Sequence, residues 1–202
     1  MRLTLFRHGE TDWNREGRCQ GHLDIPLNDN GRAQAVALAA SLAGRDIETV
    51  LSSDLSRAAD TGRMVAERLG VPIAYDARLR ETHLGIAQGH TFAEIGKMFG
   101  PDLLEFWHGE APADADLAFP EGETSADVTG RALAAMAELA AASRWRHVAI
   151  STHGGVMRRL MGLLAPAGAQ FRPIGNTAVI DAVWSPATGR PDIDITGFLR
   201  AA

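Results

Sequence analysis

Near the start of the 202-residue chain stands the stretch Leu3-Thr4-Leu5-Phe6-Arg7-His8-Gly9-Glu10. Its apolar first half predicts a buried strand that ends at Phe6. Arg7 and His8 follow at once, and ligand sites of open α/β sheets lie at the carboxyl ends of strands. Arginine binds phosphate through bidentate, charge-assisted hydrogen bonds, and a neutral imidazole can attack phosphorus. The stretch therefore indicates a phosphoryl site, with a solvated Arg-His loop as the alternative.

Two further apolar runs end in the same kinds of residue. Val148-Ala149-Ile150-Ser151-Thr152 predicts a buried strand that leads into His153-Gly154-Gly155. Val50-Leu51-Ser52-Ser53 leads into Asp54-Leu55-Ser56-Arg57, which places Arg57 in the first turn of the next helix. A histidine in a single βα loop is usually structural. Three strand ends that each present a histidine or an arginine rarely coincide by chance, so they favour one shared anion site.

These stretches belong to a longer series that resembles the histidine phosphatase superfamily, also called the phosphoglycerate-mutase-like family. The series runs in order from residue 3 to residue 155. Its segments are Leu5–Asn14, Gly17–Leu27, Asn30–Ala35, Ser52–Ala58, Leu79–Glu81 with Gly85, Gly122–Thr124 and Thr152–Gly155. The length of the first segments makes the resemblance highly specific.

The resemblance implies a role for each site residue. His8 would be the nucleophile that becomes a phosphohistidine, with its second ring nitrogen held by a nearby backbone carbonyl. Glu81 would protonate the leaving oxygen and then activate water; the alternative is an exposed glutamate paired with Arg78 or Arg80. Arg7, Arg57 and His153 would complete the catalytic set by binding the phosphoryl oxygens. Substrate binding would involve Arg7, Asn14, Gln20, Gly21, Arg57, His153 and Gly154, and Arg18 would add local positive charge.

Composition and charge narrow the expected partners. The net charge of −5 argues against a nucleic-acid surface, and no apolar stretch approaches the roughly 18 residues of a membrane span. One cysteine, Cys19, excludes an internal disulfide; with no visible secretory signal, it predicts a cytoplasmic protein. No cofactor and no metal is expected, because arginines beside His8 and His153 would repel a cation. The expected partner is a small-molecule phosphate ester, and a homodimer is left open.

Alternating strand and helix patterns predict one domain over residues 1–202, a three-layer αβα sandwich around a mostly parallel sheet. The capping residues and the apolar spacing predict helices over 29–43 after Asn28, over 55–69 before Gly70 and over 125–142 after Thr124. The runs 178–184 and 193–199 are expected to form strands at the edge of the sheet.

A small helical cap insert is predicted over about residues 85–123, where this pattern loosens. It holds eight acidic residues, one Lys or Arg (Lys97), and five of the 12 aromatic residues: Phe92, Phe99, Phe106, Trp107 and Phe119. The insert is either a subdomain with its own core or a cap over the strand ends.

The composition of this insert separates the subgroups of the resembled family. Mutases of the family carry a lysine and an arginine pair where this chain has Phe92 and Trp107-His108. We therefore expect a metal-independent phosphatase that hydrolyses small-molecule phosphate monoesters and disfavours a second anionic group. The alternatives are a cofactor-dependent phosphoglycerate mutase and a protein phosphohistidine or phosphotyrosine phosphatase.

Overall fold

The computed structural model describes residues 1–100, 118–142, 145–163 and 172–193. Within these ranges lies a six-stranded sheet in the order β3-β2-β4-β1-β5-β6. Strands β1, β2, β3 and β4 pair in parallel, whereas β5 runs antiparallel to β1 and β6 antiparallel to β5. Their bounds are β1 Arg2–Arg7, β2 Thr49–Ser52, β3 Ile73–Tyr75, β4 His147–Thr152, β5 Val179–Ser185 and β6 Arg190–Ile193. The predicted, mostly parallel sheet is confirmed.

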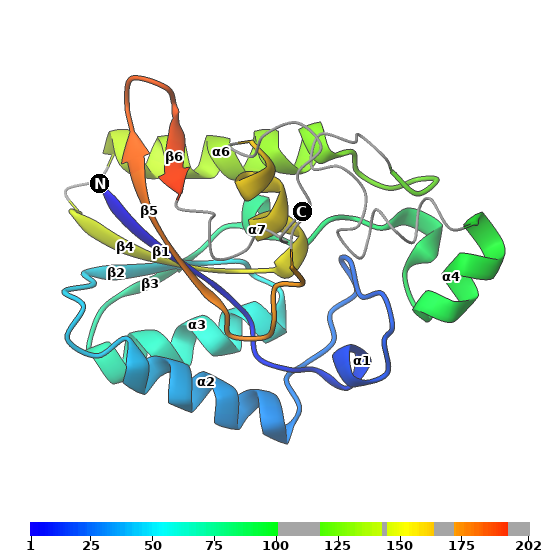
Figure 1. Ribbon diagram of the computed structural model, residues 1–202. Coiled ribbons are helices and arrows are strands. Elements are labelled where there is room, and N and C mark those ends of the chain that lie inside the picture. The colour runs from blue at the N-terminus through cyan, green and yellow to red at the C-terminus, as the bar shows by residue number, and fades with distance from the viewer. Residues whose placement is uncertain (101–117, 143–144, 164–171, 194–202) are drawn as a thin grey trace.

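Helices cover both faces of this sheet (Figure 1). Helices α2 (Asp29–Ser41) and α3 (Ser56–Leu69) lie on one face, and α6 (Ser125–Ala142) and α7 (Gly154–Gly162) lie on the other. The short helix α1 (Asp12–Arg15) and helix α4 (Phe92–Phe99) stand outside these two layers. Single 3₁₀ turns occupy Ala77–Leu79 and Gly85–Ala87. The architecture is the predicted αβα sandwich.

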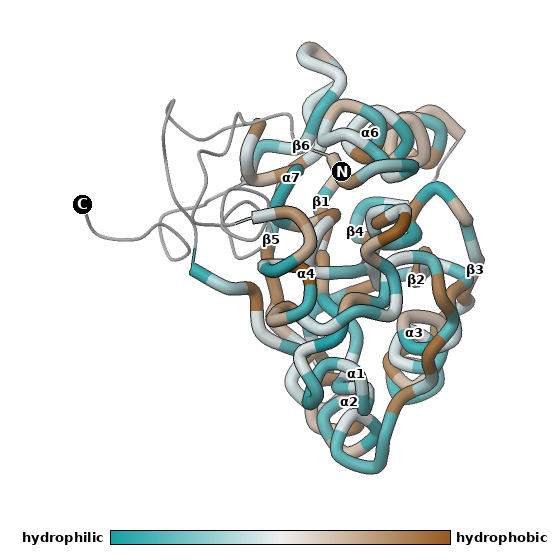
Figure 2. Tube along the Cα trace, turned by 90° about the vertical axis from the view of Figure 1, so that its right-hand side faces the viewer, coloured by the Kyte–Doolittle hydropathy of each residue, from teal (hydrophilic) through white to brown (hydrophobic). Residues whose placement is uncertain are grey.

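The side chains of β1 alternate between two cores, as the period of a strand requires. Leu3 and Leu5 pack into a cluster that includes residues of α6 and α7, such as Met136 and Met157. Phe6 faces the opposite cluster, which includes residues of α2 and α3. Hydrophobic stretches accordingly follow the strands between the helical layers (Figure 2). None of the described helices combines the length and the apolar character that crossing a bilayer requires.

Helix α2 begins as predicted but ends earlier. The side-chain oxygen of Asn28 accepts a hydrogen bond from the backbone N–H of Gly31 at 2.8 Å, which confirms the N-cap. The helix ends at Ser41 rather than at residue 43, because the N–H of Leu42 bonds the carbonyls of Leu38 and Ala40 and closes a tight last turn.

The other two predicted helices keep their bounds. Gly70 ends α3 in the left-handed region, with φ of 69°, which costs glycine little. The Thr124 hydroxyl accepts a hydrogen bond from the N–H of Asp127 at 3.1 Å. Thr124 is therefore the N-terminal cap of α6, as its position before an alanine-rich run predicts.

The two tail strands lie at one edge of the sheet, next to β1. The run 178–184 is confirmed as β5, but β6 starts at Arg190, before the expected 193–199. A tight turn closes this hairpin early: the N–H of Gly189 bonds the carbonyl of Ser185 at 3.0 Å, and Gly189 has φ of 66°. Residues 194–202 lie outside the described residues.

The single-domain boundaries and the cap insert stay predictions. Residues 85–100, which include helix α4, and residues 118–123 are the described parts of the insert. Phe106, Trp107 and His108 lie outside the described residues.

Candidate active site

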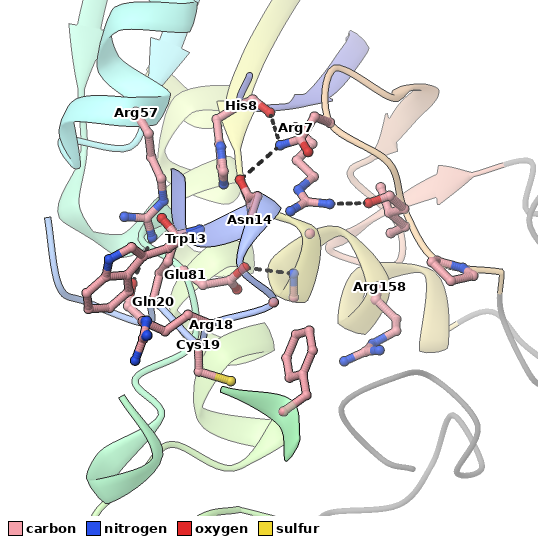
Figure 3. A pocket seen from close by; sticks show the side chains of 18 residues that line it. Arg7, His8, Trp13, Asn14, Arg18, Cys19, Gln20, Arg57, Glu81 and Arg158 are labelled. Atoms are coloured by element: carbon pink, nitrogen blue, oxygen red, sulfur yellow. Dashed lines mark hydrogen bonds between the residues drawn. The ribbon is translucent and has the colours of Figure 1, made fainter. Parts of the chain in front are cut away.

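A cavity of about 500 Å³ opens at the carboxyl ends of the parallel strands. Figure 3 shows side chains from β1, α3 and α7, and from the loops between them, directed into it. Its lining includes most of the site residues predicted from the sequence: Arg7, His8, Asn14, Arg18, Gln20, Gly21, Arg57, Glu81 and Gly154. The fold therefore assembles residues that stand up to about 150 positions apart in the chain.

Arg7 and His8 stand at the end of β1 and line this cavity. The N–H of His8 donates to the carbonyl of Thr152 at 3.1 Å, which extends the β1–β4 pairing by one residue. The next residue, Gly9, passes so close to α2 that a Cβ there would lie 2.3 Å from the carbonyl oxygen of Gly31. Glycine is required here because no larger residue fits the turn away from the sheet.

His8 has the geometry of a neutral nucleophile. Its Nδ1 lies 2.6 Å from the carbonyl oxygen of Gly9. Because a carbonyl only accepts, Nδ1 carries the hydrogen and Nε2 keeps its lone pair. Burial lowers the pKa of His8 well below 6.5, and the charges of Arg57 and Arg7 lower it further. The predicted backbone carbonyl that fixes the tautomer is confirmed.

The two predicted arginines are anchored by backbone carbonyls. Arg57 is fully buried, and its Nη1 and Nη2 donate to Leu23 at 2.9 Å and Gly21 at 2.8 Å. Nη1 of Arg7 donates to the carbonyl of Ile174 at 2.5 Å. Both Nε atoms are buried without a hydrogen-bond partner in the described part of the chain. Burial lowers the pKa of Arg57 to about 10, so it stays charged at neutral pH.

His153 stands behind His8 rather than in the cavity wall. The two ring centroids are 5.1 Å apart in an edge-on arrangement. Nε2 of His153 lies 2.9 Å from the Ser53 hydroxyl, whereas its buried Nδ1 has no partner among the described residues. Burial lowers its pKa well below 6.5, and the charge of Arg57 adds to this effect. Three buried nitrogens, on Arg7, Arg57 and His153, thus lack acceptors, which an anion would provide.

Glu81 lies in the cavity wall with 8% of its surface exposed. Its carboxylate accepts hydrogen bonds from the N–H of Thr82 at 2.8 Å and from the N–H of Gly155 at 3.0 Å. The alternative of an exposed, salt-bridged glutamate is wrong, since Arg78 pairs with Asp76 and Arg80 with Asp54. The N–H of Gly155, in the first turn of α7, is therefore used by Glu81 and is not free to bind a substrate anion.

The remaining predicted residues line the cavity with different groups. Oδ1 of Asn14 accepts from Asn176 at 3.2 Å, and Gln20 is buried with no partner for Oε1 in the described ranges. Gly21 contributes backbone, which holds Arg57. Nη1 of Arg18 donates to the carbonyl of Gly89 at 2.5 Å, and its guanidinium lies over the ring of Trp13.

Cys19 lines the same cavity and packs into the small apolar cluster that includes Leu84 and Ile95. Burial raises the pKa of its thiol to about 12. A thiol with so high a pKa is unreactive at neutral pH, and Cys19 contributes a small side chain to the packing of this cluster.

Two polar cavity residues, Arg158 and Asn176, were not predicted from the sequence. Arg158 of α7 lies on the side of the cavity away from His8 (Figure 3), and burial lowers its pKa to about 10. It follows Gly154 by four residues, so helix periodicity could have placed both on one face. Asn176 donates to the carbonyl of His8 at 3.1 Å. No local pattern marks Asn176, because its partners are far away in the sequence. In the described ranges, no group of three His, Cys, Asp or Glu side chains is arranged to hold a metal ion.

Comparisons with known proteins identify the family to which this sequence and fold are similar. The model of the histidine phosphatase superfamily, branch 1, matches residues 3–191. A glucosyl-3-phosphoglycerate phosphatase of Mycolicibacterium vanbaalenii is 38% identical over 96% of this chain and 86% of its own. A metal-independent phosphoserine phosphatase of Arabidopsis thaliana is 36% identical over 78% of this chain and 66% of its own. A solved mycobacterial glucosyl-3-phosphoglycerate phosphatase in complex with VO3 superposes with a TM-score of 0.82, at 34% identity, covering 100% of this chain and 98% of the other.

Proposed function

The chain belongs to the histidine phosphatase superfamily, and we propose that it is a phosphatase of small-molecule phosphate monoesters that works through a phosphohistidine on His8. One observation carries the proposal. A buried, neutral imidazole with its Nε2 lone pair free stands between the buried Arg57 and the partly buried Arg7, and it shares a cavity with a buried carboxyl group. The named relatives, which are phosphatases, support it.

In the first step, Nε2 of His8 attacks phosphorus and the bond from phosphorus to the ester oxygen breaks. Arg7 and Arg57 stabilise the charge on the phosphoryl oxygens, and His153 completes this set; each of the three has a buried nitrogen without a hydrogen-bond partner among the described residues. The Glu81 carboxylic acid gives its proton to the departing oxygen, so a neutral alcohol leaves. Nδ1 of His8 keeps its hydrogen, and its bond to Gly9 stabilises the positive charge on the ring.

In the second step, water attacks the phosphohistidine. The Glu81 carboxylate takes a proton from the water, the bond between nitrogen and phosphorus breaks, and inorganic phosphate leaves. His8 returns to its neutral form and Glu81 to its acid form, so the cycle closes. The arginines supply the positive charge of the site, and no step needs a metal ion.

The substrate we propose carries an acidic group in its alcohol part. Arg158 supports this, because it places a further, partly buried cation in the cavity wall, away from the phosphoryl site. The expectation that a second anion would be disfavoured rested on the acidic insert alone and did not include this α7 residue. We also propose a reducing compartment, the cytoplasm, because the one cysteine, Cys19, is a buried thiol.

The test is a panel of phosphate monoesters assayed in excess EDTA, with 3-phosphoglycerate, phosphoserine and phenyl phosphate among them. We expect release of inorganic phosphate at the same rate with and without EDTA. Loss of activity on chelation that zinc or magnesium restores would contradict the mechanism. Interconversion of 3- and 2-phosphoglycerate faster than phosphate release would identify the chain as a mutase instead.

A further inference from the structure

Glu81 lies in neither a strand nor a helix, so its position depends on what holds its backbone. It follows the 3₁₀ turn Ala77–Leu79 on the way from β3 to the cavity. Within this segment, the carbonyls of Arg78, Arg80 and Glu81 all accept hydrogen bonds from one side chain, Arg131 of α6.

The guanidinium of Arg131 uses all five of its N–H groups. Nη1 donates to the carbonyls of Arg78 at 2.7 Å and Arg80 at 2.6 Å, and one N–H of Nη2 donates to Glu81 at 2.8 Å. The others bond the carboxylate of Glu123, from Nε at 2.7 Å and from Nη2 at 2.8 Å. A planar fork with five satisfied donors permits one geometry, so it fixes the segment before the catalytic carboxyl group.

Glu123 extends this arrangement past Glu81. Its carboxylate also accepts from the N–H of His83 at 2.7 Å, and its own N–H donates to the carbonyl of His83 at 2.8 Å. Nε2 of His22 lies 2.7 Å from the carbonyl of Glu81 and, because a carbonyl only accepts, donates to it. The backbone is therefore held on both sides of Glu81 while its side chain points into the cavity.

We propose that Arg131 is a positioning residue for proton transfer by Glu81, an inference that rests on the proposed function. Arg131 is not among the residues that line the cavity, so its effect on the reaction passes through the backbone of residues 78–81. Without the Arg131 guanidinium, the carboxylate of Glu81 keeps its own hydrogen bonds. The backbone carbonyls of residues 78, 80 and 81 lose the hydrogen bonds that Arg131 donates to them. Proton transfer needs the carboxyl group within about 3 Å of the leaving oxygen, so it should suffer before phosphoryl binding does.

The experiment compares two aryl phosphates of similar shape, phenyl phosphate and 2,4-dinitrophenyl phosphate. Phenolate is a poor leaving group that needs the proton, whereas dinitrophenolate leaves without it. In Arg131→Ala we expect kcat/KM for phenyl phosphate to fall about tenfold or more, as part of the 10²–10⁴ that general acid catalysis supplies. For dinitrophenyl phosphate we expect a change within about twofold, since transfer to His8 needs no acid.

Four further variants make the result decisive. Glu81→Gln should show the same selective loss, and adding Arg131→Ala to it should cost phenyl phosphate little more, because both changes remove one function. Arg78→Ala removes a neighbouring arginine that pairs with Asp76 and Glu138, and it should affect both esters equally. Arg131→Lys keeps the charge with fewer donors and should lie between wild type and Arg131→Ala; it also serves if the alanine variant does not fold.

Equal losses for both esters in Arg131→Ala, or in Arg131→Lys if only that variant folds, would overturn the positioning role and leave a purely structural one. A fully additive double variant would also overturn it. If the wild type releases phosphate from neither ester nor from the wider panel, the proposed function itself fails.

Discussion

The His8 imidazole is buried beside Arg7 and Arg57, and His153 shares that environment. Each ring stays neutral because burial and positive neighbours both oppose its protonation. A neutral ring is needed for attack on phosphorus, so the same electrostatic field that binds the phosphoryl group also keeps the nucleophile ready. The same positive charge and burial lower the free energy of unfolding at acid pH.

This effect predicts how stability depends on pH. Unfolded histidine has a pKa near 6.5, and the folded values for His8 and His153 lie well below it. Below pH 6.5 the unfolded chain therefore binds more protons, and the free energy of unfolding falls as pH falls. Each histidine contributes a slope of up to about 1.4 kcal/mol per pH unit. Urea unfolding between pH 7 and 5 should show a shallower fall for His8→Gln; an unchanged slope would mean that His8 protonates in the folded protein.

Gly155 gives a second prediction, on the contact between Glu81 and α7. A Cβ at Gly155 would lie 2.3 Å from the Glu81 carboxylate, whereas one at Gly154 would meet the nearest atoms of Arg7 at 3.4 Å. The carboxylate is the end of a flexible side chain and can move. Gly155→Ala should therefore stay folded, with Tm close to wild type, but lose kcat about tenfold or more. Gly130→Ala is the control, because nothing lies within 4 Å of a Cβ there; equal kcat of the Gly155→Ala and Gly130→Ala variants would contradict the assigned Glu81 geometry.

Between elements, a very close approach joins the loop after β1 to the first turn of α2. A Cβ on Gly31 would lie 2.0 Å from the backbone oxygen of Glu10, which no side-chain movement can relieve. This contact sets the direction in which the chain leaves β1 and hence the position of His8. The residues that shape the site therefore include glycines with no chemistry of their own.

We predict that Gly31→Ala destabilises the protein by about 1–3 kcal/mol or more, the usual cost of overpacking. Gly130→Ala is the matched control, because Gly130 is an exposed helical glycine with nothing within 4 Å of a Cβ. Its replacement should stabilise α6 by about 0.5–1 kcal/mol. Thermal unfolding of both variants is the measurement, and a Gly31→Ala protein as stable as wild type would show that the loop can shift.

The whole molecule shows which features local sequence can predict. The ends of β1 and β4 and the caps of α2 and α6 depend on neighbouring residues, so Arg7, His8 and Thr124 could be assigned before the fold was known. Arg131 could not, because its contacts with Glu81 cross 50 positions of sequence. Asn176 reaches across 168 positions to His8 for the same reason.

The acidic insert is not the sole source of charge around the cavity. The insert is acidic and poor in cations, whereas Arg158 comes from α7, which follows the insert in the sequence. The sheet brings α7 to the same edge as the loops that follow β1 and β3. The cavity therefore combines charges from stretches that lie far apart in the sequence. Charge around a site is thus a property of the fold.

The measurement that tests the central claim most directly is rapid acid-free quenching of the enzyme during turnover of a ³²P-labelled monoester. Trypsin releases the peptide His8–Arg15, in which His8 is the sole histidine. We predict label in this peptide that is stable in base and labile in acid, as a phosphorus–nitrogen bond requires, and no label or turnover in a folded His8→Ala variant. Label on any other residue, or substantial turnover by His8→Ala, would contradict the phosphohistidine mechanism.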